Sequence, residues 1–490
     1  MNTMQQLNKH TLDKLPQSVL INQAALNSSI GIVHIGPGAF HRGHQAVYTD
    51  NAMEFGGSWG ICAVSMRSKG LRDELAEQDN IYTLAIIDEK PSYQVISAIK
   101  EVLVLNEQRQ QVMQRLVAPS THIISLTVTE KGYCLNGQGR LDEQHPDVMY
   151  DISHLDAPKS VIGLLTAALK LRRQNATGDL TIISCDNLAD NGFKLCQAVI
   201  CFAAKFDSQL ANWISQNVAF PNTMVDSITP ASNDELCERV AHAIQLQDNW
   251  PIQREAFSQW VVEDNFSGPR PAWDKVGVTF TQDVSAYEKA KLRLLNGSHS
   301  TLAYLGLRCG FETVNEAISQ PALHKLIDKM LKEQVKQSFS APSELNIDTY
   351  IDAILKRYSN PHIRHLLAQI AWDGSQKLPF RLLNTIEDNL AKNYAISLLC
   401  VGVAAWLHFI VNAAHTHFKL VDPLADKLLS VAAKCTGKNK ADVAILLAIE
   451  QVFPVLLANN SVFSAAVTDA YLSLSALNAD NIEQQINTLF

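Results

Sequence analysis

The chain has 490 residues, of which 47% are apolar and 18% are charged, and it carries a formal net charge of −8. This length exceeds what one hydrophobic core holds, and the composition excludes a disordered or fibrous chain. The negative charge argues against nucleic acid or an anionic membrane as the main partner. Nine cysteines without a CxxC pair, and an N-terminus without an apolar signal segment, predict reduced thiols in a cytoplasmic protein.

Short β-rich segments alternate with helical patterns up to about residue 280. Strands are expected at 31–36, 60–65, 82–87, 122–128 and 180–185, with helices at 71–78 and 157–174. Several of these segments are apolar throughout, which is typical of parallel strands covered on both faces. The pattern predicts an α/β, doubly wound, Rossmann-like domain over residues 1–284. From 285 to 490 helical patterns predict an α-helical domain, with turns at SNPH, DGSQKLP and VDPL.

The first expected strand runs into the glycine-containing turn GPGAFHRGHQ. Glycines at a first strand-to-helix turn let the backbone approach a pyrophosphate, which then lies at the helix N-terminus. The third glycine comes two residues too late for GxGxxG, so a plain turn remains an alternative. We expect Gly36, Gly38, Phe40 and Arg42 to contact a dinucleotide.

The second expected strand ends in AVSMRSKGLRDE, with no carboxylate between Ser65 and Gly70. A carboxylate there would accept from the ribose 2′-hydroxyl of NAD and repel the 2′-phosphate of NADP. We therefore expect Arg67 at the ribose and tolerance of NADP as well as NAD. The alternative is that Arg67 and Lys69 are solvated loop charges.

The strand expected at 180–185 ends in SCDN, which places Asp186 and Asn187 at its carboxyl end. Active groups of open α/β sheets gather at that edge. We expect Asp186 to lie by the cofactor and the Asn187 carboxamide to face a reacting oxygen. Turn formation is the alternative for Asn187.

The segment KLRLLNGSH places Lys291, Asn296 and His299 within nine residues. An amine, a carboxamide and an imidazole can take a proton from an alcohol and hold the resulting oxyanion without a metal. On an α-helix, Asn296 and His299 share a face, and Lys291 lies about 80° from His299. Lysine has an ordinary pKa of ~10.4, so this role needs burial beside an apolar or cationic wall. A solvated surface lysine is the alternative.

The segment from Tyr394 to Ala414 is apolar and long enough to span a bilayer. It contains Ser397, His408 and Asn412 and lacks flanking arginine and lysine belts. These features favour a helix buried on all sides in a large helical domain.

Ordered motifs along nearly the whole chain resemble the long-chain polyol-specific dehydrogenases, the mannitol dehydrogenase family. They are GPGAFHRGHQAVYTD, SLTVTEKGY, SCDNLADNG, FPNTMVD, QWVVEDNF, GPRPAWDKVGV, KLRLLNGSH and DGSQKLP. The resemblance implies a metal-independent, NAD(P)-dependent dehydrogenase that is a monomer or weak oligomer. It makes Lys291 the catalytic acid/base, Asn187 and Asn296 the oxyanion-binding pair, and His299 the substrate-orienting imidazole.

The resemblance also assigns supporting residues. Asp226 and Lys377 match polar residues that line the substrate pocket, and Glu288 matches a carboxylate that connects the lysine to solvent. Ser227 stands where the family usually has arginine, which removes a cation near the pocket.

The substrate is expected to be decided in the segment SNPHIRHLLAQIAWDGSQKLP, which supplies Arg364, His365, Gln369 and Lys377. A substrate carboxylate calls for a bidentate arginine or a close lysine. The segment resembles the mannonate branch of the family more than the mannitol branch, so we expect mannonate/fructuronate interconversion with Arg364 and Lys377 holding the substrate. A surface position for Arg364 would remove most of that argument.

Three alternatives remain open. One is a mannitol 2-dehydrogenase or another polyol dehydrogenase of the same family. The others are a zinc-dependent polyol dehydrogenase and a catalytically silent nucleotide-binding sensor on the same fold. The presence of Lys291, Asn187, Asn296 and His299 together argues against a sensor.

Overall fold

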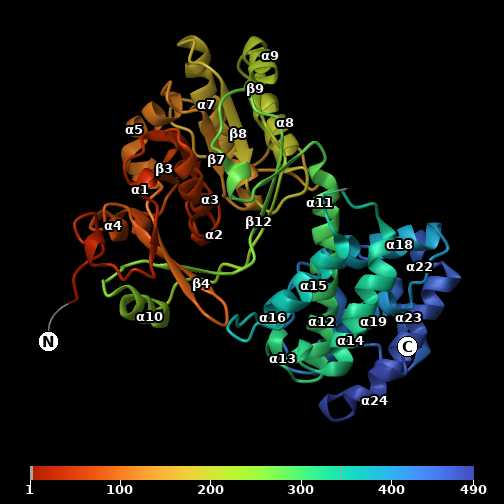
Figure 1. Cartoon of the computed structure of the whole chain (residues 1–490). Coiled ribbons are helices and arrows are strands. Elements are labelled where there is room, and N and C mark those ends of the chain that lie inside the picture. Colours follow the sequence, from red (N-terminus) through yellow and green to blue (C-terminus); the bar gives the residue numbers. More distant parts are fainter. Residues whose placement is uncertain (1–3, 343) are drawn as a thin grey trace. The chain divides into compact units, whose positions relative to one another are not determined.

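The computed structural model describes residues 4–342 and 344–490 (Figure 1). Contacts divide the chain into two compact domains, an N-terminal domain over Met1–Ser285 and a C-terminal domain over Ala286–Phe490. The division predicted from the sequence lies one residue earlier, between 284 and 285.

A six-stranded parallel sheet forms the centre of the N-terminal domain. Its strands are, in spatial order, β6 (Ile99–Val104), β3 (Gly60–Ser65), β2 (Ile30–Ile35), β7 (Ile123–Leu126), β8 (Leu180–Ser184) and β9 (Val218–Ala219). This is the order of the doubly wound dinucleotide-binding fold, and the predicted fold class is confirmed. Chain order reverses between β2 and β7, where such sheets bind ligands beyond the carboxyl ends of the strands.

Helices cover both faces of this sheet because neighbouring strand residues point to opposite sides. Val33 and Ile35 belong to a core with helices α5 (Leu105–Val117), α7 (Val161–Gln174), α8 (Asn191–Ala204) and α9 (Ser208–Asn217). Ile32 belongs to a second core that contains α3 (Gln45–Ala52).

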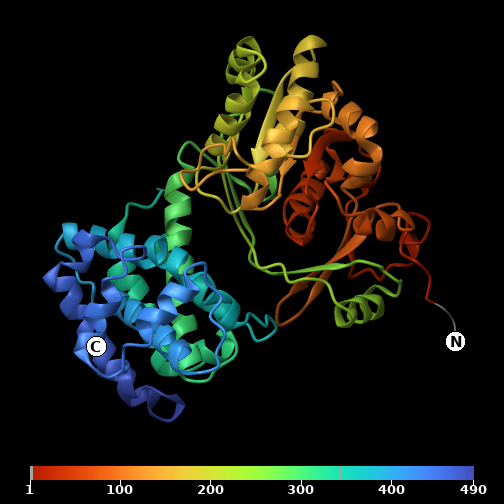
Figure 2. The ribbon, with the colours of Figure 1, turned by 180° about the vertical axis from the view of Figure 1, so that it is seen from behind.

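A second, mixed sheet has the order β1 (Leu20–Ile21), β5 (Ser92–Ile96), β4 (Tyr82–Ile87) and β11 (Ile252–Glu255). It lies apart from the six-stranded sheet, together with α10 (Asp234–Ile244), in both views (Figures 1 and 2). The strand predicted at 82–87 is present as β4 but lies outside the six-stranded sheet: it pairs antiparallel with β5 and parallel with β11, and β6 takes the place beside β3. Leu84 and Ala85 enter different cores, so β4 is covered on both faces and has the composition of a parallel strand.

A third sheet of the N-terminal domain joins β10 (Thr223–Asp226), β12 (Gln259–Glu263) and β13 (Thr279–Thr281). Trp260 of β12 and the nearby Trp273 are buried, with ring centroids 4.6 Å apart.

The C-terminal domain is helical. Its main helices are α12 (Gly297–Arg308), α14 (Pro321–Lys329), α15 (Ile347–Tyr358), α18 (Asn384–Ala391), α19 (Ser397–His415), α20 (Ala425–Ala432), α21 (Lys440–Leu447) and α23 (Ser461–Ser473). Helices α12 and α23 pack on α19 (Figure 1). Among the described residues, α19 is the one helix that is long and apolar enough to cross a membrane, and most of it is buried inside the domain.

The expectation of a turn at DGSQKLP is wrong. Asp373 takes a left-handed conformation (φ 55°), and a helix, α17 (Gly374–Leu378), follows at once. A Cβ on Gly374 would lie 2.3 Å from Trp406 Nε1, so the glycine is there for close packing rather than for a turn.

Candidate active site

The turn after β2 is built on two glycines with different surroundings. Gly36 has φ +91° and donates its N–H to the Val64 carbonyl at 2.9 Å, and its own carbonyl accepts from the Thr127 hydroxyl. A Cβ on Gly36 would lie 2.3 Å from the Thr127 carbonyl oxygen. Gly38 is exposed at the start of α2 (Ala39–Gly43), and a Cβ there would meet only the Gly36 carbonyl oxygen, at an ordinary contact distance of 3.9 Å. Backbone is therefore accessible at Gly38, at the point where strand order reverses.

The next predicted cofactor residues are engaged with the protein. Phe40 is half-buried and stacks on His44 with ring centroids 4.8 Å apart. Arg42 is buried, donates to the Trp250 carbonyl at 2.8 Å, and lies over the Tyr82 and Trp250 rings. Burial lowers the pKa of Arg42. These contacts tie the glycine turn to the second sheet, and a cofactor contact by Phe40 or Arg42 remains a prediction.

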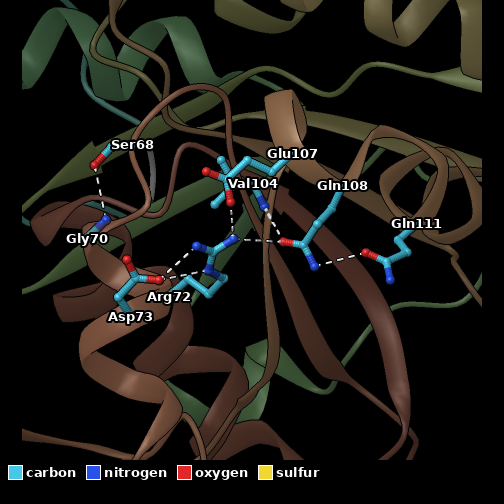
Figure 3. A network of polar contacts seen from close by, with 8 residues as sticks. All are labelled: Ser68, Gly70, Arg72, Asp73, Val104, Glu107, Gln108 and Gln111. Carbon is cyan, nitrogen blue, oxygen red and sulfur yellow. Dashed lines mark hydrogen bonds and ion pairs between the residues drawn. The ribbon is translucent and has the colours of Figure 1, made fainter.

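The loop after β3 carries the residues expected at the ribose. Arg67 has a side chain that is 78% exposed, with one nitrogen 3.6 Å from Asp147. Arg72 is the hub of a polar network in which its guanidinium contacts Asp73 and Glu107 at 2.8 and 2.6 Å (Figure 3). Two carboxylates hold Arg72, whereas Arg67 has one longer contact, to Asp147, and a cofactor contact by Arg67 remains a prediction.

Asp186, at the carboxyl end of β8, organises the loop that follows β7. Its carboxylate accepts from the backbone N–H groups of Val128 and Thr129 at 2.9 and 2.8 Å and from the Tyr133 hydroxyl at 2.6 Å. Burial raises the pKa of Asp186. The carboxylate thus shapes the edge expected to hold the cofactor, and Asn187, the next residue, is exposed at that edge.

Asp226 is buried at the end of β10, where its backbone pairs with Gln259 of β12. Ser227 follows, and its hydroxyl donates to the Phe257 carbonyl at 3.0 Å. The short side chain that replaces the family arginine is therefore bonded to the adjacent backbone.

In the C-terminal domain, Lys291–Asn296 forms a π-helix between α11 (Val284–Ala290) and α12. The continuous α-helix assumed for this segment is wrong, because Gly297 N–H bonds to the Leu292 carbonyl five residues back. In a π-helix, positions five apart take the relation that positions four apart have in an α-helix. Lys291 and Asn296 are thereby brought towards one face, which an α-helix would not do. Glu288 lies half-buried three residues before Lys291.

His299 is the buried centre of a side-chain cluster in the same domain, with 9% of its surface exposed. Its ring stacks on Tyr358 at 5.1 Å between centroids and meets the edge of His365 at 4.6 Å. Its Nε2 atom is buried and has no hydrogen-bond partner among residues 4–342 and 344–490. Burial is the main cause that holds the pKa of His299 well below its ordinary value.

Three cations and His365 add to that lowering of the His299 pKa. The cations are Arg381, Arg357 and Lys377. Arg381 donates to the Ser300 hydroxyl at 2.9 Å. The cluster therefore combines an imidazole whose charged form is disfavoured with three nearby cations.

Arg364 is placed differently from the sequence-based expectation. Its side chain is 74% exposed and forms an ion pair with Glu312 at 3.0 Å. The argument for a carboxylate substrate therefore loses the support of Arg364. Arg357, Tyr358 and Arg381 are not among the residues expected from the sequence, whereas His365 is one of the side chains that the substrate segment supplies.

Comparisons with known proteins agree with this architecture. The model of the mannitol dehydrogenase Rossmann domain matches residues 30–275, and the model of the mannitol dehydrogenase C-terminal domain matches residues 283–475. The chain belongs to the mannitol dehydrogenase family. It is therefore a dehydrogenase, as the family resemblance predicted.

Individual relatives of this family are similar over nearly the full length. The chain is 40% identical to D-mannonate oxidoreductase of Escherichia coli, over 90% of this chain and 93% of the relative. It is 37% identical to mannitol 2-dehydrogenase of Aspergillus fumigatus, over 90% and 89%. The solved complex of Pseudomonas fluorescens mannitol 2-dehydrogenase with NAD and D-mannitol is 34% identical, with a TM-score of 0.82 over 99% of both chains.

The described residues contain no group of three or more His, Cys, Asp or Glu side chains arranged to hold a metal ion. Metal-independent chemistry by Lys291 remains a prediction that depends on measurement.

Proposed function

We propose that this dehydrogenase interconverts D-mannonate and D-fructuronate with NAD. The observation that carries the proposal is the group of three cations, Arg357, Lys377 and Arg381, that lies near enough to His299 to help lower its pKa. Close cations stabilise a carboxylate, whereas a neutral polyol gains little from them. The similarity to the E. coli D-mannonate oxidoreductase supports the same substrate class.

In this proposal Lys291 takes the proton from the substrate hydroxyl as the hydride leaves the same carbon. Asn187 and Asn296 donate carboxamide N–H groups to the developing oxyanion, which such donors stabilise most in the transition state. His299, neutral because it is buried, orients the substrate hydroxyl. Glu288 passes the proton between Lys291 and solvent.

Asp226 and Lys377 would hold the rest of the substrate. A buried carboxylate at the end of β10 suits hydroxyl donors, and Lys377 belongs to the cations around His299. We place the carboxylate of the sugar acid at these cations.

The turn from Gly36 to Gly38 and the edge organised by Asp186 would hold NAD. The fit rests on Gly38, where backbone is open at the reversal of strand order. When bound, NAD supplies the hydride acceptor. Arg67 carries no carboxylate neighbour on its own loop before Gly70, so we expect NADP to be accepted as well.

The substrate is tested by steady-state assays of D-mannonate, D-mannitol, altronate and arabinitol with NAD and with NADP. We expect the highest kcat/KM with D-mannonate. A preference for mannitol would contradict the substrate assignment and leave the family membership intact.

The role of Lys291 is tested by comparing Lys291→Ala with Lys289→Ala. Lys289 is an exposed lysine on α11 and serves as a matched control. We expect Lys291→Ala to lower kcat about 10²- to 10⁴-fold, the usual contribution of a general base, while NADH binding measured by fluorescence is retained. Near-normal turnover would remove Lys291 from the mechanism, and loss of wild-type activity with a chelator would overturn metal independence.

Mannitol 2-dehydrogenase activity is the second candidate. It is favoured by the surface ion pair of Arg364 and by the NAD and D-mannitol bound in the P. fluorescens relative. The same substrate comparison distinguishes the two.

A further inference from the structure

His365 places a second imidazole directly beside His299. The two rings meet edge to face with centroids 4.6 Å apart. Among the described residues, neither His365 Nδ1 nor His299 Nε2 has a hydrogen-bond partner, and both atoms are buried. Buried polar atoms are normally paired, and an unpaired one costs stability. Two of them in adjacent rings indicate a place where a ligand supplies the partners.

The backbone holds His365 in this position. The segment forms an antiparallel bridge between Thr313 and Leu366, and the His365 carbonyl accepts from Val314 N–H at 3.0 Å. The His365 N–H bonds to the Ile363 carbonyl at 2.9 Å, which makes a tight turn centred on Arg364. Arg364 is exposed at this turn, where it pairs with Glu312, and the His365 ring lies against His299.

The surroundings of both imidazoles disfavour their charged forms. Burial, then Arg357, lowers the pKa of His365, and burial is also the main cause for His299. A neutral imidazole nitrogen forms a hydrogen bond with a hydroxyl group as donor or acceptor. The cations around His299 supply the positive charge that a carboxylate needs, so the imidazoles remain for the hydroxyl groups of the same substrate.

We infer that His365 is a specificity-determining residue whose Nδ1 atom binds a hydroxyl group of the sugar-acid chain, next to the hydroxyl that His299 orients. The inference rests on the proposed sugar-acid dehydrogenase function. It adds a residue to the substrate site and gives the pair of imidazoles one hydroxyl each.

The test uses the full-length protein with His365→Phe and His365→Asn, and His362→Asn as a control. Phenylalanine keeps the ring and loses the nitrogens, whereas the asparagine amide keeps a polar atom near the position of Nδ1. We expect His365→Phe to raise the KM for D-mannonate about tenfold, the size of one buried hydrogen bond, without raising the KM for NAD. His365→Asn should recover most of that loss. His362 is exposed in the same segment, and its variant should match the wild type.

The opposite ranking of the His365→Phe and His365→Asn variants would overturn the inference. If His365 only packs against His299, the ring-keeping His365→Phe should resemble the wild type and His365→Asn should be the poorer enzyme. Thermal unfolding checks that each variant is folded. If His365→Phe does not fold, His365→Gln replaces it, because its longer amide leaves the position of Nδ1 and should raise the KM as His365→Phe would.

A failure of the proposed function gives a different result. A wild type that prefers mannitol refutes the sugar-acid assignment, and the KM effects of the His365 variants are then measured with mannitol, where the same order is expected. A wild type that oxidises none of the four substrates refutes both proposals.

Discussion

Replacement of Gly36 by alanine should strongly lower the stability of the N-terminal domain, whereas Gly38→Ala should leave that stability nearly unchanged. Gly36 has φ +91°, where a side chain costs about 1–2 kcal/mol. Its new Cβ would also lie 2.3 Å from the Thr127 carbonyl oxygen, a backbone atom that cannot rotate away.

Relief of that contact would separate two hydrogen-bonded backbone segments. Gly36 N–H bonds to the Val64 carbonyl at 2.9 Å, and Thr127 N–H bonds to the Ile35 carbonyl at 3.0 Å. Loss of one or two such bonds adds about 1 kcal/mol each. The sum is about 2–4 kcal/mol, a large part of the stability of about 5–15 kcal/mol typical of a domain. In a domain of this size it should lower Tm on the order of 10 °C.

The control is Gly38→Ala. Its Cβ would meet only the Gly36 carbonyl oxygen, at 3.9 Å, so its stability should stay within about 0.5 kcal/mol of the wild type. If the cofactor approaches the backbone at Gly38, this variant should still bind NADH about tenfold more weakly, a loss of about 1.4 kcal/mol.

Calorimetry without cofactor and NADH fluorescence titration measure the two effects separately. A Gly36→Ala protein as stable as the wild type would refute the packing argument. Gly38→Ala with normal NADH affinity would refute the proposed approach of the cofactor.

Two further substitutions test packing and charge elsewhere. Burial raises the pKa of Asp50 to about 7, from 3.8, while the Ser97 N–H bonds to its carboxylate. Because the pKa is higher in the folded protein, the stability that this group contributes is full below about pH 4 and is lost as the pH rises to about 7. Asp50→Asn should therefore reduce the fall in unfolding free energy between pH 4 and 7, measured by urea unfolding. An unchanged fall would contradict this. Gly374→Ala would put a Cβ 2.3 Å from Trp406 Nε1 and 2.8 Å from the Tyr304 hydroxyl, and overpacking of this kind should cost about 1–3 kcal/mol in denaturant unfolding. A neutral result there would mean that α17 shifts without penalty.

Much of the fold is predictable from local pattern. The strands β3 and β4 have the predicted bounds, and β2, β7 and β8 lie within two residues of theirs. Hydrophobic periodicity indicates how a segment is buried, and strands of the six-stranded sheet and of the mixed sheet are buried in the same way. It does not report the partner strand, so the pairing of β4 with β5 and β11 is visible only in the structure.

The site divides in the same way. Lys291, Asn296 and His299 are adjacent in sequence, so one motif reveals them together. The cations Arg357 and Arg381 come from different helical segments and reach His299 only through packing. Neither has a motif that marks it.

The sequence by itself determined the two-domain organisation, the family and the side chains available for proton transfer, because these depend on residue type and on order along the chain. The tertiary structure decided which strands pair, that Lys291–Asn296 is a π-helix, and that His365 rather than Arg364 faces His299. These features depend on backbone pairing and on how the turn at 363–365 directs its side chains. Neither quantity is contained in the residue types alone.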